Sequence, residues 1–202
     1  MKTFINSVSA GILIAIGGDV FLACDNKYVG AVLFSVALLS ICYMGYYLYT
    51  GKIAYLAEDF SLNNAKNLLI GLLGNLITTF ALGKLIAYAI PTFCEKANTI
   101  CSAKLSQSIP QTFVRGLFCG ILMFLAVEIF KKYKTPIGIL FCIPVFILSG
   151  FEHSIADMFY FGVSSIWDYK ILLFILFVVL GNTVGGMLLP LLSKIGGKFN
   201  GK

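Results

Sequence analysis

The residues best suited to chemistry lie together in one apolar stretch, around the single histidine of the chain. His153 is flanked by Glu152 and Ser154, and Asp157 follows four residues further on. Ionisable side chains inside an apolar span are costly, and they are usually kept for a function. An imidazole exchanges a proton near neutral pH, which suits a pathway that must neutralise an anion before an apolar constriction. The plainer alternative is a histidine that is hydrogen-bonded in the core.

A second apolar stretch carries a matching polar interruption. Pairs that share an offset of 105 residues are Gly45 with Gly150, Tyr47 with Glu152, and Lys52 with Asp157. We expect Tyr47 and Glu152 to support the interrupted segments through backbone donors. We hypothesise that Lys52 and Asp157 form an ion pair, because neither charge lies cheaply alone in a membrane. Alternatively, Lys52 extends to the cytoplasmic interface and Asp157 reaches water on the other side.

The elements that position these residues are membrane spans. Of the 202 residues, 59% are hydrophobic and 12% are charged, and the mean hydropathy of +0.93 excludes an ordinary soluble domain. A bilayer needs about 20 apolar residues per spanning helix. Six candidate spans follow, at residues 5 to 24, 28 to 57, 67 to 91, 112 to 130, 136 to 163 and 169 to 193. Residues 1–202 are therefore expected to form a single transmembrane channel domain, and the first span reads as a retained helix.

The two halves of the chain, about 5–91 and 112–193, resemble each other. Besides the pairs above, Gly74-Asn75 matches Gly181-Asn182 at an offset of 107 residues. Three spans is an odd number, so the second copy enters the membrane upside down. We therefore predict an all-α inverted repeat of six transmembrane helices, whose broken second and fifth helices meet near the midplane. The alternative is that the glycines only allow close helix packing.

The formal charge of +6 is distributed among the helix ends, which argues against nucleic-acid binding. The positive-inside rule places both termini in the cytoplasm, because one face collects the cluster from Lys131 to Lys134 and the basic tail with Lys198 and Lys202. Cys94 and Cys101 share an outward connection and form either a disulfide or two free thiols. Neither a metal nor a cofactor is expected. Arg115 opens the fourth span and either attracts anions into a vestibule or anchors the topology.

Several of these segments resemble the formate/nitrite transporters, a family that includes formate, nitrite and hydrosulfide channels. The run from Ser149 to Phe159 is similar to the family's fifth-helix signature. The segment from Leu48 to Gly51 resembles its second-helix loop, and the two Gly-Asn pairs also fit. The resemblance covers nearly the whole chain.

The resemblance implies an aquaporin-like homopentamer in which each protomer has its own pore. It places His153 at the pore centre with Thr50 as its loop partner. Narrow points are implied on the outward side at Phe34 and Phe146, and on the inward side at Leu38, Leu48 and Tyr49. A small monovalent anion would be attracted, share a proton at His153 and pass as a nearly neutral acid, because burying an uncompensated charge is expensive.

The sequence also departs from the family pattern. Many members have an acid at the position of Tyr47, an uncharged residue at Lys52, an asparagine at Asp157 and, in the fourth helix, an asparagine at Phe124. Because the first span begins at about residue 5, we expect this chain to lack the long amphipathic N-terminal helix of larger members.

Three functions remain to be compared. The leading hypothesis is a channel for small monovalent anions, of the formate, nitrite or hydrosulfide class. The second is a conduit for a small neutral solute without anion selection. The third is a membrane enzyme that uses Glu152 and His153 as acid and base. It lacks a clear nucleophile or metal constellation, so we expect that the protein is not an enzyme.

Overall fold

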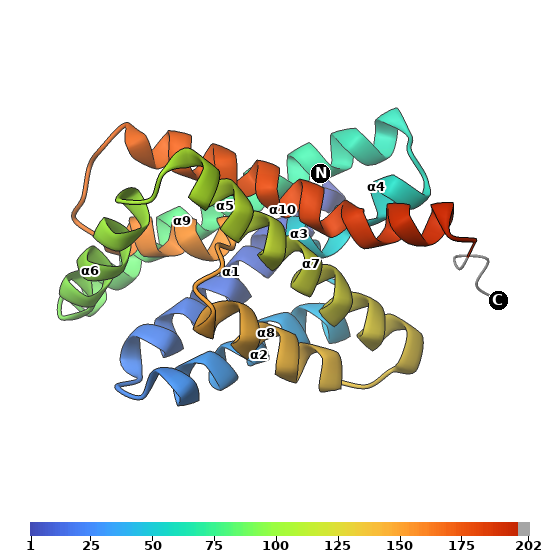
Figure 1. The fold of residues 1–202 in the computed structure, drawn as a ribbon. Helices are drawn as coiled ribbons and strands as arrows, with labels where there is room; N and C mark the ends of the chain where they lie inside the picture. The colour runs from blue at the N-terminus through green and yellow to red at the C-terminus, as the bar shows by residue number, and fades with distance from the viewer. Residues whose placement is uncertain (198–202) are drawn as a thin grey trace.

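The computed structural model describes residues 1–197, and within this range the chain is built of α-helices and connecting segments without a β-strand (Figure 1). The helices are α1 Lys2–Ala23, α2 Lys27–Met44, α3 Tyr49–Lys52, α4 Tyr55–Glu58, α5 Leu62–Ala89, α6 Phe93–Leu105, α7 Ile109–Tyr133, α8 Ile137–Leu148, α9 Ser154–Val163 and α10 Lys170–Ile195. The predicted all-α class is confirmed. The basic tail residues Lys198 and Lys202 lie outside the described residues.

Five helices within residues 1–197 are long and apolar enough to cross a membrane: α1, α2, α5, α7 and α10. They contain 18 to 28 residues, against about 20 needed for the hydrocarbon core. The fifth predicted run, 136 to 163, is divided between α8 with 12 residues and α9 with 10. The second run, 28 to 57, is divided among α2, α3 and α4.

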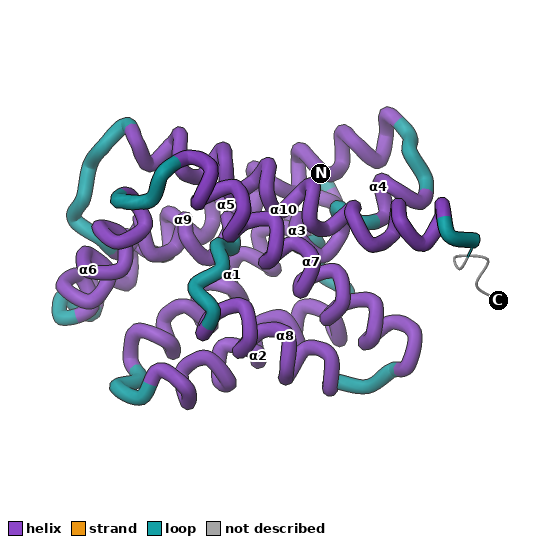
Figure 2. Tube along the Cα trace, viewed as in Figure 1, coloured by secondary structure: helices purple, strands orange, loops and turns teal. Residues whose placement is uncertain are grey.

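Both divided runs change direction at a glycine. α2 ends at Met44, and non-helical backbone follows from Gly45 to Leu48. α8 ends at Leu148, and non-helical backbone follows from Ser149 to His153. Gly45 has φ 70° and Gly150 has φ 69°, a left-handed conformation that a side chain disfavours. Figure 2 shows the second of these segments as a loop that runs through the interior between α8 and α9.

The helices pack in pairs around these loops. α7 lies along α10, α5 packs against α1 and α9, and α2 packs against α1 and α8 (Figure 1). A β-carbon on Gly120 of α7 would overlap the backbone carbonyl of Asn182 on α10. The glycines therefore serve two purposes at different positions, because some end a helix and others let two helices approach.

The predicted connection at residues 92 to 111 contains a helix, α6, which the sequence analysis missed. α6 packs against α9 and carries both Cys94 and Cys101. Seven residues along a helix span about 10 Å, which is too far for a disulfide. Both thiols are free. The disulfide alternative is therefore wrong, and α6 instead brings one of its lysines to the candidate site.

Candidate functional site at the two helix breaks

The two breaks meet through one hydrogen bond. Oγ1 of Thr50, at the start of α3, lies 2.8 Å from Nε2 of His153, which precedes α9. The residues are 1% and 2% exposed. Nδ1 of His153 accepts a hydrogen bond of 3.2 Å from the backbone N–H of Ala156 and so caps α9. Because Nδ1 is the acceptor, a neutral ring carries its proton on Nε2, where it can donate to Thr50.

Two asparagines hold the breaks in place with the same pattern of bonds. Asn75 of α5 accepts from Tyr49 N at 2.8 Å and donates to Tyr47 O at 3.0 Å and to Ser7 O at 2.8 Å. An asparagine side chain thus satisfies backbone groups that the interrupted helix leaves open.

Asn182 of α10 does the same at the second break. It accepts from Ser154 N at 3.0 Å and donates to Glu152 O at 2.8 Å and Gly116 O at 2.9 Å. Backbone groups buried in a membrane must find partners within the protein, and both Gly-Asn pairs supply them.

A buried charged cluster lies beside His153. Nζ of Lys104, from α6, pairs with Glu152 and lies 2.8 Å from Oδ1 of Asp157. Nε2 of Gln107 donates to Glu152 at 2.6 Å. Burial opposes the charge of Lys104, but the Asp157 and Glu152 carboxylates outweigh burial, so the pKa of this ammonium lies above its ordinary value.

The hypothesised ion pair between Lys52 and Asp157 is wrong. Asp157 takes Lys104 as its partner, while Nζ of Lys52 lies 6.0 Å from the ring centroid of Tyr47 and 5.9 Å from that of Tyr55. Lys52 is half-buried at the end of α3 and lines a cavity there. The repeat matches these two positions in sequence, but Asp157 pairs with Lys104 of α6, which lies between the two halves, whereas Lys52 lies near two tyrosines of its own half.

Two aromatic rings lie next to the histidine. The Phe146 ring stacks on the His153 ring with centroids 5.8 Å apart, and Phe34 meets Phe146 edge-on at 6.4 Å. Both phenylalanines are buried, at 2% and 4% exposure. They form an apolar wall beside the imidazole, on α2 and α8.

A cavity of about 220 Å³ opens beside α3, where Gly51 and Lys52 are part of its lining. Leu38 and Leu48 are in its lining, whereas Tyr49 is not: its hydroxyl lies 2.6 Å from Oγ1 of Thr183 on α10. Two of the three residues expected at the inward narrow point, Leu38 and Leu48, therefore line the same cavity. The lining also contains three lysines, Lys52, Lys131 and Lys134.

Arg115 of α7 is exposed, and its backbone carbonyl accepts a hydrogen bond of 3.3 Å from Glu152 N. Its guanidinium lies close to Gly150, 3.8 Å from where a β-carbon would stand. The arginine is thus next to the second break, at the start of the fourth predicted span.

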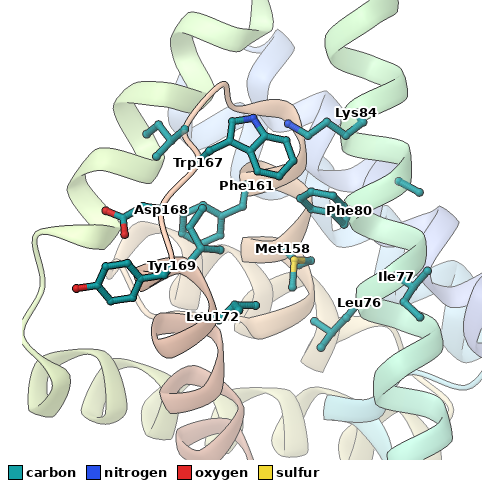
Figure 3. A pocket seen from close by; sticks show the side chains of 13 residues that line it. Leu76, Ile77, Phe80, Lys84, Met158, Phe161, Trp167, Asp168, Tyr169 and Leu172 are labelled. Carbon is teal, nitrogen blue, oxygen red and sulfur yellow. The ribbon is translucent and has the colours of Figure 1, made fainter.

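A larger cavity, of about 630 Å³, lies away from this site (Figure 3). Side chains of α5, α9 and the segment before α10 line it, and neither His153 nor Thr50 is among them. Nζ of Lys84 lies 4.7 Å from the Trp167 ring centroid at one edge. Exposed Trp and Tyr beside a lysine are typical of a membrane–water interface.

The sequence analysis missed Lys104 and Gln107. Lys104 lies in a polar stretch of the sequence, where nothing in its neighbours distinguishes it from Lys96. The one available signal was indirect: two acids in the fifth span require a buried cation, and it can come from any segment.

Known proteins resemble this chain over most of its length. Residues 1–195 match the family model described as "Formate/nitrite transporter". The "Uncharacterized transporter YwcJ" of Bacillus subtilis is 28% identical over 193 residues, covering 84% of this chain and 75% of that protein. The "Nitrite transporter NirC" of Escherichia coli is 25% identical over 210 residues, covering 91% and 78%.

Solved structures share the fold. A structure titled "FNT family ion channel" superposes with a TM-score of 0.82 at 23% identity, covering 97% of this chain and 90% of that chain. A "Pentameric formate channel with formate bound" gives 0.76 at 24% identity, with 93% of each chain covered.

Proposed function

This chain belongs to the formate/nitrite transporter family, and we propose that it is a membrane channel for small monovalent anions of the formate, nitrite or hydrosulfide class. The observation that carries the proposal is the buried Thr50–His153 hydrogen bond at the meeting of two helix breaks. In this proposal the bond is the polar point of the passage, and the rings of Phe146 and Phe34 are its apolar wall. The family consists of transporters, so the chain is not expected to catalyse a reaction.

We further propose that α8 and α9 together make the sixth crossing and that the chain is an inverted 3+3 repeat. The matched bonds of Asn75 and Asn182 support this, because each asparagine binds backbone groups at equivalent positions of its own break. The left-handed Gly45 and Gly150 support it as well. A chance arrangement of packing glycines has no reason to repeat both features.

His153 is proposed to assist the anion by sharing a proton. While Nε2–H donates to the Thr50 hydroxyl, that hydroxyl can donate its own proton to an oxygen of the anion. A full positive charge on the ring requires a proton on Nδ1, which ends the bond to Ala156 N and places a cation near Lys104. A hydrogen-bonded, partly neutralised anion is therefore favoured over a resting imidazolium.

One observation favours the second candidate, a channel for a neutral solute. Lys104 faces two carboxylates, Glu152 and Asp157, so this cluster has no surplus positive charge to attract an anion. In that case Arg115 is the remaining cation next to the second break. Both candidates use the same passage and differ in selectivity.

The assembly and its placement are also proposed. A homopentamer in the cell membrane, with each protomer enclosing its own pore, fits the solved pentameric channel whose fold the chain shares. We propose that both termini lie in the cytoplasm, which the Lys131–Lys134 cluster at the end of α7 supports by the positive-inside rule.

The test is stopped-flow flux of formate, nitrite and hydrosulfide into proteoliposomes from about pH 5 to about pH 8, for wild type and His153→Asn. Asparagine is a good N-cap, so this variant keeps α9 capped while it removes the titrating ring. An anion channel shows flux of at least one anion, and the variant changes its pH dependence or selectivity.

Thr50→Ser and Thr50→Val form a matched pair of controls. Serine keeps the hydroxyl opposite Nε2, and valine replaces it with a methyl group of the same shape. We expect serine to behave as wild type and valine to shift the pH profile in the direction of His153→Asn. Absence of flux for all three anions, above empty liposomes, contradicts the anion channel and favours the neutral solute.

A further inference from the structure

The lining of the 220 Å³ cavity carries several positive charges, which the passage of a monovalent anion does not explain. It lies between α2, α3 and α7, and three ammonium-bearing side chains line it: Lys52, Lys131 and Lys134. Lys52 is half-buried at its inner part, and the other two are exposed at the end of α7. The cavity thus opens toward the side that carries the Lys131–Lys134 cluster.

Within residues 1–197, none of the three lysines forms an ion pair. Glu128 lies three residues before Lys131 on α7, and the Glu58 carboxylate on α4 interacts with the charge of Lys131 without pairing with it. Nζ of Lys131 lies 3.7 Å from the Tyr55 ring centroid, and Nζ of Lys52 lies 5.9 Å from the same centroid. One aromatic ring therefore holds two like charges near each other.

Charges of one sign that converge on a concave, partly dehydrated surface create a field that concentrates counter-ions. An anion with more than one charge gains from each lysine at once. An oxyanion also offers several acceptors, which match the three donors of each ammonium group.

The inner end of the cavity prevents such an ion from continuing. Leu38 and Leu48 are fully buried apolar residues of its lining, and Thr50, which bonds His153, follows Leu48 by two residues. The cost of moving an ion into an apolar region rises steeply with its charge, so one shared proton cannot compensate a polyvalent ion. The ion would bind and remain.

We propose that this cavity binds a polyvalent oxyanion of the phosphate class, supplied as a free ion, and that the bound ion blocks the inward mouth. The block rests on the proposed channel function, whereas the binding does not. This separation allows the two to be tested independently.

Binding is tested by alkylation of Cys42, which is half-buried in the cavity lining. The full-length protein, in detergent, is treated with a maleimide with and without inorganic phosphate, and labelling of each cysteine is followed by mass spectrometry. Cys24 and Cys142 are also half-buried but outside this lining, so they serve as internal references. Phosphate should slow labelling of Cys42 alone, and potassium chloride at equal ionic strength should not.

The site is then assigned by variants. Lys52→Gln and Lys131→Gln each remove one charge-assisted contact, and we expect roughly 10-fold more phosphate to be needed for the same protection. Lys132→Gln is the matched control, because Lys132 is adjacent in sequence but absent from the lining. It should behave as wild type. Two independent variants keep the test valid if one of them does not fold, as judged by gel filtration.

Flux gives the second readout. Phosphate enclosed on the inward side should reduce formate uptake in wild type and in Lys132→Gln, and less so in the other two variants. Reconstitution into purely zwitterionic liposomes, compared with liposomes that contain phosphatidylglycerol, separates free phosphate from lipid head groups. Protection that requires the anionic lipid overturns the free ion as the ligand.

Equal labelling of Cys42 with and without phosphate, or equal effects of phosphate and chloride, overturns the site. Protection of Cys42 in a protein that conducts none of the tested anions leaves the site standing and contradicts the channel function. Anion flux without protection of Cys42 by phosphate supports the channel function and overturns the binding site.

Discussion

At the residue scale, the most demanding feature is the group formed by Lys104, Glu152 and Asp157. The side chains of both acids are 3% exposed and that of the lysine is 13% exposed, so water screens them little. A buried ion pair is weak evidence for stability, but removal of one member leaves an uncompensated charge. We therefore expect the folded structure of the second break to depend on Lys104.

Lys104→Met should destabilise the protein by about 3–5 kcal/mol, because two carboxylates remain buried without a cation. Asp157→Asn alone should cost less, since Glu152 keeps its partner. Melting temperature in detergent is the measurement. Lys96→Met on the same helix is the control: Lys96 pairs with Asp25, whose side chain is 99% exposed, and such surface pairs contribute roughly 0–1 kcal/mol.

If Lys104 stabilises the protein mainly by neutralising the two carboxylates, the double variant Lys104→Met with Asp157→Asn should be more stable than Lys104→Met alone. If the double variant is less stable by the sum of the two single effects, Lys104 acts mainly through packing.

At the element scale, the sequence predicted the places where two spans are interrupted but missed helix α6. Glycines and polar residues inside an apolar run are visible in a window of a few residues, so Gly45 and Gly150 could be identified. α6 is short and polar, and the side chains that it packs against come from segments distant in the sequence. A local pattern does not contain the partner of Lys104, because ion pairing across the fold depends on how helices approach. For the same reason, the repeat led to a wrong partner for Lys52.

Each break should depend on its own asparagine. Asn182→Ala leaves Ser154 N and Glu152 O at the second break without this partner, and each buried unpaired group costs about 1–3 kcal/mol. Hydrogen–deuterium exchange should therefore rise in residues 149–157 and remain low in residues 45–52.

Asn75→Ala is the matched variant and should give the reverse pattern, since its partners lie at the first break. Loosening of both breaks by either variant contradicts independent support. It would indicate that the Thr50–His153 bond transmits the disturbance from one half to the other.

At the scale of the whole molecule, one chain leaves many large apolar side chains exposed, especially along α2, α5 and α10. A bilayer covers such surfaces, and neighbouring protomers can cover part of them. The sequence predicted the membrane from composition, because that property is summed over all residues. Which face meets another protomer is a matter of shape, and composition does not encode it.

The proposed pentamer makes a prediction that separates one pore per chain from one shared pore. Thr50, His153 and the aromatic wall all belong to a single chain, so each protomer should conduct independently. When wild type and a non-conducting variant such as Leu48→Trp are co-expressed and purified as mixed pentamers, formate flux should fall in proportion to the wild-type fraction. Native mass spectrometry gives the subunit number and the mixture. A shared central pore predicts a much steeper loss, as the wild-type fraction raised to the number of subunits, because one obstructed chain then closes the assembly.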